Sequence, residues 1–125
     1  MSQKIEVKNL SVSYGLIKAV KDISFQFQTG EITALIGSNG AGKTTTLKAL
    51  CGLLPHSGAV LLEQKDVASL TAPERLMEKI ALCPEGRGIF PNLTVTENLM
   101  LGAYLQKSKR KSRTCLRCNF KCSLD

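Results

Sequence analysis

The 125-residue sequence has no long hydrophobic run. Its uncharged apolar stretches are far shorter than the roughly 20 residues that a membrane-spanning helix needs. No secretory signal opens the chain, because Met1–Ile5 leads directly into a strand-like segment. We therefore expect a cytosolic protein without direct membrane insertion, so that any membrane association is made through a partner.

Histidine is almost absent, although it is the side chain most often used for proton transfer near neutral pH. The single histidine, His56, lies in the sequence Pro55–Gly58, which predicts an exposed turn. We expect a surface residue there, in preference to a catalytic base.

Negative charge is scarce only at one end of the chain. The net charge is +7, but residues 107–125 contain seven of the 17 lysines and arginines and only one of the ten acidic residues. Residues 1–106 are therefore close to neutral, and the high pI does not by itself indicate nucleic-acid binding. Cys51 and Cys83 stand alone in apolar surroundings and are expected to be reduced core residues.

The sequence Gly37–Thr44 reads GSNGAGKT and matches G-x-x-x-x-G-K-[ST] at each fixed position. Such a loop curls so that successive N–H groups point at phosphate oxygens. Gly40 and Gly42 supply the positive φ angles and the missing Cβ atoms that close approach requires. Lys43 would reach the β- and γ-phosphates, and Thr44 would place its hydroxyl on Mg²⁺.

The flanks of this loop have the expected order of strand, loop and helix. Residues 31–36 form a short β-branched and apolar run that predicts a buried strand. Residues 45–51 predict a helix that stops at Gly52. A dinucleotide-binding G-x-G-x-x-G motif is excluded, because no third glycine follows at the required spacing. We therefore predict that the chain binds a nucleoside triphosphate.

Alternation of apolar and polar residues predicts half-buried strands over 5–14 and 23–27, an antiparallel pair or trio ahead of the loop. A further short strand is expected over 59–62. Glu63 follows it as the acid of a Walker B motif would, but the expected aspartate is absent and the turn chemistry suits a small sheet, so we reject that interpretation. Tyr14 is either a strand-end aromatic or a residue that stacks on adenine.

Two T-x-x-E capping boxes predict the start of further helices. Thr71 and Glu74 open a short helix through Lys79, and Thr94 and Glu97 open a second one. Between them, residues 80–83 are apolar and strand-like and are followed by a loop with two glycines.

These features together resemble the ATP-binding subunits of ABC transporters over residues 3–106. The resemblance rests on a strand pair ending in an aromatic residue, the GSNGAGKTT loop, a short β segment after the helix that follows this loop, and a strand and loop before TVTENL. PEGR at 84–87 with FPNLTV at 90–95 further resembles the subunits of bacterial branched-chain amino acid importers, because Glu85 stands where most relatives have glutamine. The resemblance implies an α/β P-loop NTPase fold with an antiparallel β subdomain, truncated before the signature motif and Walker B.

The resemblance also assigns roles to individual positions. Tyr14 matches the adenine-stacking aromatic, and Glu85 matches the residue that contacts Mg²⁺ or the attacking water. Lys43 and Glu85 would be catalytic, and Thr44 and Glu85 would hold Mg²⁺. The predicted ATP-binding residues are Tyr14, Gly37, Ser38, Asn39, Gly40, Ala41, Gly42, Lys43, Thr44 and Thr45.

The implied function is to couple ATP binding and hydrolysis to solute import. The expected partners are membrane permease subunits, which would dock on 87–104, and a second ATP-binding subunit; no nucleic acid is expected. The chain would lie on the cytoplasmic face of the inner membrane, held there by the permease. Because no LSGGQ signature, Walker B Asp-Glu pair or switch histidine occurs in the sequence, we expect weak Mg-ATP binding at best and poor hydrolysis.

Two other interpretations stay open: a different P-loop protein such as a kinase or GTPase, and a non-hydrolysing nucleotide- or nucleic-acid-binding fragment. The domain would span 1–106, and the basic, cysteine-rich tail 107–125 would lie outside the fold. The tail could be a nucleic-acid or lipid arm, a three-cysteine metal site, or the product of a reading-frame shift, which we favour. A truncated parallel sheet would leave apolar surface open, so we expect association or partial order.

Overall fold

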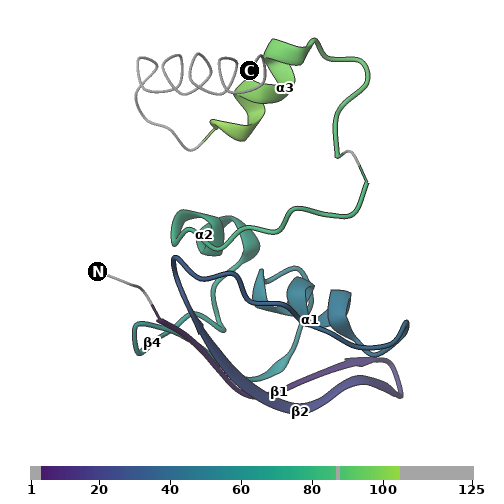
Figure 1. The fold of residues 1–125 in the computed structure, drawn as a ribbon, viewed down its shortest axis with the longest axis vertical. Coiled ribbons are helices and arrows are strands. Elements are labelled where there is room, and N and C mark those ends of the chain that lie inside the picture. The colour runs from purple at the N-terminus through teal and green to yellow at the C-terminus, as the bar shows by residue number, and fades with distance from the viewer. Residues whose placement is uncertain (1–3, 87, 105–125) are drawn as a thin grey trace. The chain divides into compact units, whose positions relative to one another are not determined.

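The computed structural model describes residues 4–86 and 88–104 (Figure 1). The chain divides into two compact units, Met1–Leu82 and Cys83–Asp125, which are described one at a time. The tail predicted over 107–125 lies outside the described residues. Within those residues, no helix combines the length and the apolar character that crossing a bilayer requires.

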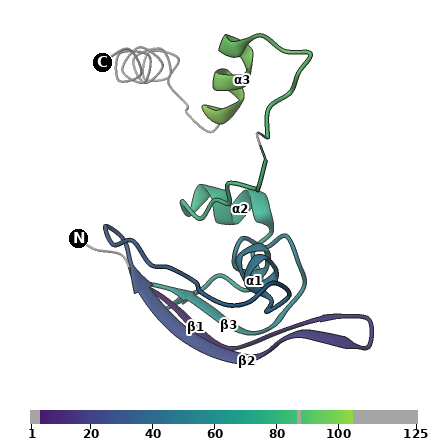
Figure 2. The same ribbon diagram turned by 45° about the vertical axis from the view of Figure 1, so that its right-hand side comes forward.

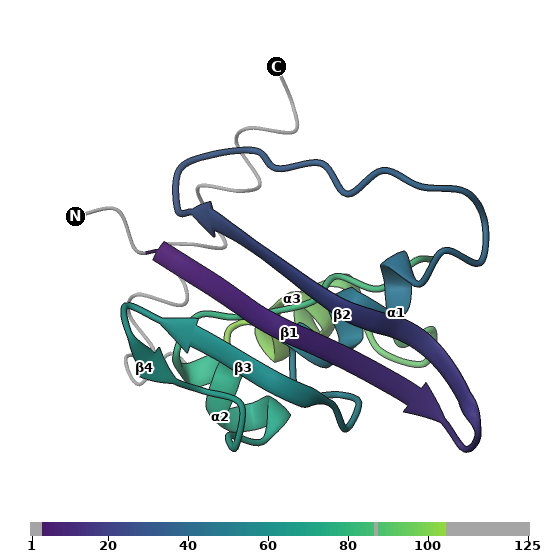
Figure 3. The same cartoon turned by 90° about the horizontal axis from the view of Figure 1, so that it is seen from below.

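The first unit is built on an antiparallel sheet with strand order β2-β1-β3-β4 (Figure 3). Its long strands are β1 (Lys4–Tyr14) and β2 (Ile17–Gln28), and its short strands are β3 (Ser57–Leu62) and β4 (Lys65–Asp66). The predicted antiparallel strands are thereby confirmed, although β2 begins six residues earlier than the alternation indicated. The two-residue strand β4 was not predicted, because it is too short for any periodicity.

Two helices lie on one side of this sheet (Figures 1 and 2). Helix α1 (Lys43–Leu50) follows the glycine loop, and α2 (Ala72–Met77) follows the predicted capping box. In that box, the N–H and the hydroxyl of Thr71 both donate to a carboxylate oxygen of Glu74, at 2.7 and 2.6 Å. These bonds define the start of α2 and lower the pKa of Glu74.

The core of the first unit lies between the sheet and α1. Alternate residues of the strands face inward and meet the buried face of the helix, as half-buried strands require. The buried apolar residues of this core are Val7, Leu10, Val12, Val20, Ala49, Leu50, Val60, Leu62 and Val67.

The strand predicted over 31–36 is wrong for this structure, as is the one predicted over 80–83. Neither segment forms a strand, and Ile32 and Ile36 are 103% and 91% exposed. A central parallel strand is stabilised by neighbours on both edges and by cover on both faces. Among the described residues no strand pairs with either segment, so the apolar sequence alone does not order them.

The second unit contains α3 (Val95–Gly102), which starts at the predicted box of Thr94 and Glu97. The side chain of Asn98 holds the preceding loop: it accepts from Phe90 N–H at 2.8 Å and donates to the carbonyls of Phe90, Leu93 and Thr94. This amide fixes how the chain enters the helix.

Two predictions about single side chains need correction. Cys51 is buried as expected, but Cys83 is exposed, because the segment around it does not enter a sheet. His56 is only partly exposed: its Nδ1 lies 3.3 Å from the carbonyl of Leu54, and its Nε2 is shielded from solvent. The imidazole is therefore less exposed than the turn sequence predicted.

Candidate nucleotide-binding site

The loop before α1 has the backbone geometry that its glycines predicted. Gly40 and Gly42 have φ angles of +84° and +87°, in the left-handed region that side chains disfavour. The carbonyl of Gly42 accepts from both the N–H and the hydroxyl of Thr46, at 2.8 and 2.9 Å. The loop is thereby joined rigidly to the first turn of the helix.

Gly42 is required for a second reason, its closeness to β2. A Cβ atom at this position would lie 2.7 Å from the carbonyl oxygen of Ala19 and 3.2 Å from Val20 Cγ2. A side chain there would push the loop away from the strand. The sequence motif predicted the φ angle, but it carried no information about this contact.

Lys43 extends back over the loop. Its ammonium donates to the carbonyls of Gly37 and Ser38, at 2.8 and 2.7 Å. A positive charge is therefore held above the curled backbone, where the phosphate-loop hypothesis places the β- and γ-phosphates. The neighbouring Thr44 is exposed, so its hydroxyl is accessible to a ligand.

The start of α1 presents unneutralised positive potential. Its N-cap is Gly42, which has no side chain to accept from the first-turn N–H groups, and no acidic residue lies in the first turn. Helix N-termini carry four unpaired N–H groups and the positive end of the dipole. An anion of phosphate size fits the donors that this end of the helix offers.

Tyr14 reaches the loop although 31 residues separate it from Thr45 in the sequence. Its hydroxyl lies 3.5 Å from Thr45 Oγ1, and the side chain remains 48% exposed. The end of β1 therefore lies beside the first turn of α1. An aromatic side chain with a free ring face in this place suits stacking with a base, which stays a prediction.

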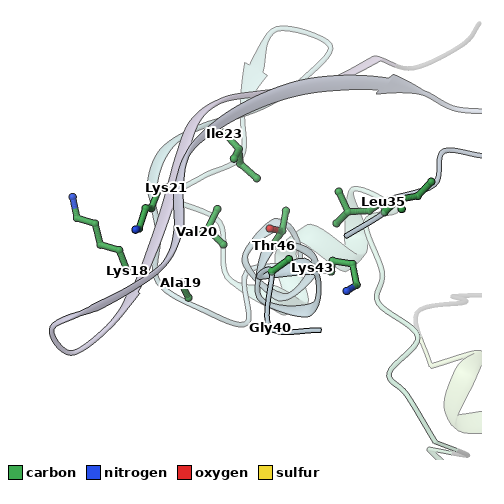
Figure 4. Close-up of a pocket in the computed structure, with 11 residues that line it drawn as sticks. Lys18, Ala19, Val20, Lys21, Ile23, Leu35, Gly40, Lys43 and Thr46 are labelled. Carbon is green, nitrogen blue, oxygen red and sulfur yellow. The ribbon is translucent and has the colours of Figure 1, made fainter. Parts of the chain in front are cut away.

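A cavity of about 460 Å³ opens between β2 and the glycine loop (Figure 4). Val20 and Ile23 of β2 and Thr46 of α1 point into it. The ammonium groups of Lys18 and Lys21 point away from α1 in the same view. None of its lining residues is acidic; they are Lys18, Ala19, Val20, Lys21, Ile23, Leu35, Ile36, Gly40, Ala41, Lys43 and Thr46.

The structure thus brings together the predicted loop residues 37–45 and Tyr14 within the first unit. Glu85 lies in the second unit, at an exposed bend beside Gly86. Because the two units are described separately, a role for Glu85 at the γ-phosphate stays a prediction.

Arg75 was missed by the sequence reasoning. Its side chain is only 1% exposed, and its Nη1 donates to the carbonyls of Ala49 and Leu50 at 2.8 and 2.7 Å. Further bonds run to the carbonyls of Leu70 and Ala68. Arg75 therefore caps the C-terminal end of the helix whose other end forms the candidate site. Nothing in the T-x-x-E pattern distinguishes it from a solvated helix arginine.

Comparison with known proteins agrees with this geometry. The family model for ABC transporters matches residues 20–121, and the chain belongs to this family. The fold is that of an ABC ATP-binding subunit: a solved structure of such a subunit superposes with a TM-score of 0.71 at 36% identity, over 85% of this chain and 44% of that one. The alternatives of a kinase or a GTPase therefore have no support.

Among curated relatives, the high-affinity branched-chain amino acid transport ATP-binding protein BraG of Pseudomonas aeruginosa is 43% identical over 96 residues. These residues are 76% of this chain and 41% of BraG. The xylose import ATP-binding protein XylG of Shigella flexneri is 32% identical over 105 residues, which are 82% of this chain and 20% of XylG. The chain thus spans less than half the length of each relative.

Proposed function

We propose that this chain is the ATP-binding part of an ABC importer subunit and that residues 37–45 bind the triphosphate of ATP. One observation carries most weight: the glycine loop, the ammonium of Lys43 and the uncapped start of α1 converge on one place. The backbone N–H dipoles of the loop and helix start and the charge of the Lys43 ammonium then act on one anion.

Within this site each part has its own task. The backbone N–H groups of 37–45 hold phosphate oxygens, and Tyr14 stacks on the adenine ring. Thr44 Oγ1 would hold Mg²⁺, an ion that binds few protein ligands and would neutralise phosphate charge at this site. Glu85 serves as a second oxygen ligand or orients water, and Lys43 and Glu85 are the catalytic side chains.

The imported solute is proposed to be a branched-chain amino acid. BraG, whose name specifies this class of solute, shares 43% identity with the chain, against 32% for the xylose relative XylG. The PEGR sequence at 84–87 supports the same assignment, because glutamate stands at the position where most ABC subunits have glutamine.

The second unit is proposed to dock on the membrane permease at the cytoplasmic face of the inner membrane. Its described part exposes a run of large apolar side chains that a partner could cover: Ile89, Phe90, Leu93, Val95, Leu99, Met100, Leu101 and Tyr104. A second ATP-binding subunit is the other proposed partner, and its signature motif would cover the nucleotide. Because the 125-residue chain itself contains no signature motif, Walker B pair or switch histidine, it should bind Mg-ATP weakly and hydrolyse it poorly.

Calorimetric titration of the 125-residue chain with Mg-ATP tests the proposal. Lys43→Ala should weaken binding at least about tenfold, because one charge-assisted contact to phosphate is lost. Lys48→Ala is the matched control, since Lys48 is an exposed lysine on the same helix, and its effect should be small.

Equal effects of the two substitutions would contradict the proposed site. Salt-dependent affinity for nucleic acid that disappears on deleting 107–125, without ATP binding, would instead favour a nucleic-acid-binding module.

A further inference from the structure

The pairing register of the long β1–β2 hairpin shifts at three places. Two of these shifts form bulges that face each other around Leu10, and the third lies between Val12 and Ser13. Leu10 pairs with Ile23, and the pairing register shifts by one residue on each side of this pair, in opposite directions. On one side the extra residue belongs to β1, next to Asn9; on the other it belongs to β2, next to Asp22. Both residues adopt left-handed backbone conformations, with φ angles of +53° and +48°.

The two bulges are held by reciprocal hydrogen bonds across the strands. The N–H of Asn9 donates to Ser24 Oγ, and the N–H of Asp22 donates to Ser11 Oγ, both at 2.9 Å. Between them, Asn9 Nδ2 donates to Asp22 Oδ1 at 2.8 Å. We call these four residues the cross-strand brace. The backbone N–H groups of Asn9 and Asp22 are thus both paired with side chains.

A third strand fixes the brace from the other edge of β1. A Cβ atom on Gly58, at the start of β3, would lie 2.4 Å from the carbonyl oxygen of Asn9 and 2.5 Å from that of Lys8. Only glycine allows β3 to approach this closely, at its own φ of +95°. The bulge therefore occurs at one defined position in the sheet.

The part of the hairpin beyond the brace is the part that contacts the candidate nucleotide site. Tyr14 reaches Thr45, and Ala19 and Val20 pack against Gly42. Bulges bend a strand and increase its twist. Figure 2 shows β1 and β2 curving beneath α1, so a change of bend at the brace would move Tyr14 relative to the loop.

We propose that the cross-strand brace is a positioning element for the base of the nucleotide: it sets where Tyr14 stands relative to the phosphate loop. Its residues do not line the cavity beside the glycine loop, and they act through Tyr14. The inference rests on the proposed function, in which residues 37–45 hold the triphosphate and Tyr14 the adenine. The brace then controls the share of the affinity that comes from the base.

A purely structural role can be separated from this one by comparing two ligands. Mg-ATP has both the base and the phosphates, whereas Mg-tripolyphosphate has the phosphates alone. A brace that only stabilises the fold should change the affinities for both ligands together. A brace that positions Tyr14 should change the affinity for ATP and leave that for tripolyphosphate unchanged.

Asn9→Asp is the informative substitution, because it sets two carboxylates against each other and removes the 2.8 Å bond. Asn9 and Asp22 are both exposed, so the core is not altered. We expect about tenfold weaker binding of ATP, within the range of one lost base–aromatic stack, and unchanged binding of tripolyphosphate. Asn9→Asp combined with Asp22→Asn restores a donor and an acceptor in reverse order and should restore ATP affinity.

Two further variants strengthen the test. In a Tyr14→Ala background, Asn9→Asp should have no additional effect on ATP binding, because the residue through which the brace acts is gone. Gln28→Glu makes the same amide-to-acid change at an exposed position at the far end of β2 and should leave both affinities unchanged. If Asn9→Asp fails to fold, Ser24→Ala, which removes one acceptor only, replaces it with the same expected pattern.

Equal losses for both ligands, no loss for either, or full additivity with Tyr14→Ala would each overturn the positioning role. If the unaltered chain binds neither Mg-ATP nor Mg-tripolyphosphate, the proposed function itself is wrong and the inference with it. If tripolyphosphate binds and Tyr14→Ala does not weaken ATP binding, the phosphate site stands and only the base-positioning role is rejected.

Discussion

Arg75 illustrates how a single side chain distant from the phosphate loop holds the helix that presents it. Its guanidinium satisfies four carbonyls, two of them at the end of α1. Burial lowers its pKa, and this cost is offset by the bonds that it donates. Gly52 makes room for it, because a Cβ there would lie 3.1 Å from Arg75 Nε.

We expect Arg75→Met to lower the free energy of unfolding by about 2–4 kcal/mol, since it leaves buried carbonyls without donors. Chemical denaturation followed by circular dichroism measures this change. Lys48→Met removes an exposed cation from the last turn of the same helix and should cost less than about 1 kcal/mol. Equal costs would mean that only the charge at the helix end matters, and not the buried hydrogen bonds.

At the scale of helices and strands, the sequence predicted the elements that a pattern of neighbouring residues defines. Both capping boxes place a helix start where the structure has one, alternation found β1 and part of β2, and a short apolar run found β3. The segments 31–36 and 80–83 were wrong as strands, because a parallel strand depends on partners that local sequence does not describe. The bulges were also missed. The apolar positions change phase between Val7 and Leu10, a local signal that the prediction did not use, and Asp22 lies outside the strand predicted over 23–27.

For the candidate site, the motif predicted the loop conformation and the position of Lys43. It could not predict which strand lies against Gly42 or how Tyr14 reaches Thr45, because those contacts depend on the bend of the hairpin. The resemblance supplied the role of Tyr14, and the 3.5 Å contact supports it.

The box at α3 should make this helix sensitive to acid. The hydroxyl and the backbone N–H of Thr94 both donate to the carboxylate of Glu97. These two bonds, the hydroxyl's more than the N–H's, lower the pKa of Glu97 below its ordinary value of 4.5. A carboxyl whose folded pKa is depressed adds stability above its unfolded pKa, and this stability is lost as the pH falls through the folded pKa. Chemical shifts of residues 95–98 should therefore report loss of helix in acid.

Glu97→Gln should weaken α3 at neutral pH and remove most of this pH dependence. Glu85→Gln, an exposed acid in the same unit, is the control and should leave the acid transition in place. An unchanged transition in Glu97→Gln would show that the box does not govern the helix.

At the scale of the whole molecule, apolar surface is left open in the first unit. Ile32 and Ile36 are almost fully exposed, and the chain spans 41% and 44% of the lengths of BraG and of the solved subunit. Both residues lie in a segment with which no strand pairs in the described part of the chain. Such a segment favours association with other chains.

We therefore expect concentration-dependent association of the 125-residue chain in sedimentation velocity. Ile32→Lys with Ile36→Lys should reduce it, whereas Leu16→Lys, an equally exposed position between β1 and β2, should reduce it less. A monodisperse monomer with one cooperative thermal transition would contradict this expectation.

The most direct test of the central claim is an NMR titration of the ¹⁵N-labelled chain with Mg-ATP. The account predicts amide shift changes concentrated at residues 37–45 and near Tyr14, with β4 unaffected and with the changes abolished in Lys43→Ala. A titration that leaves residues 37–45 unperturbed at saturating Mg-ATP would contradict it.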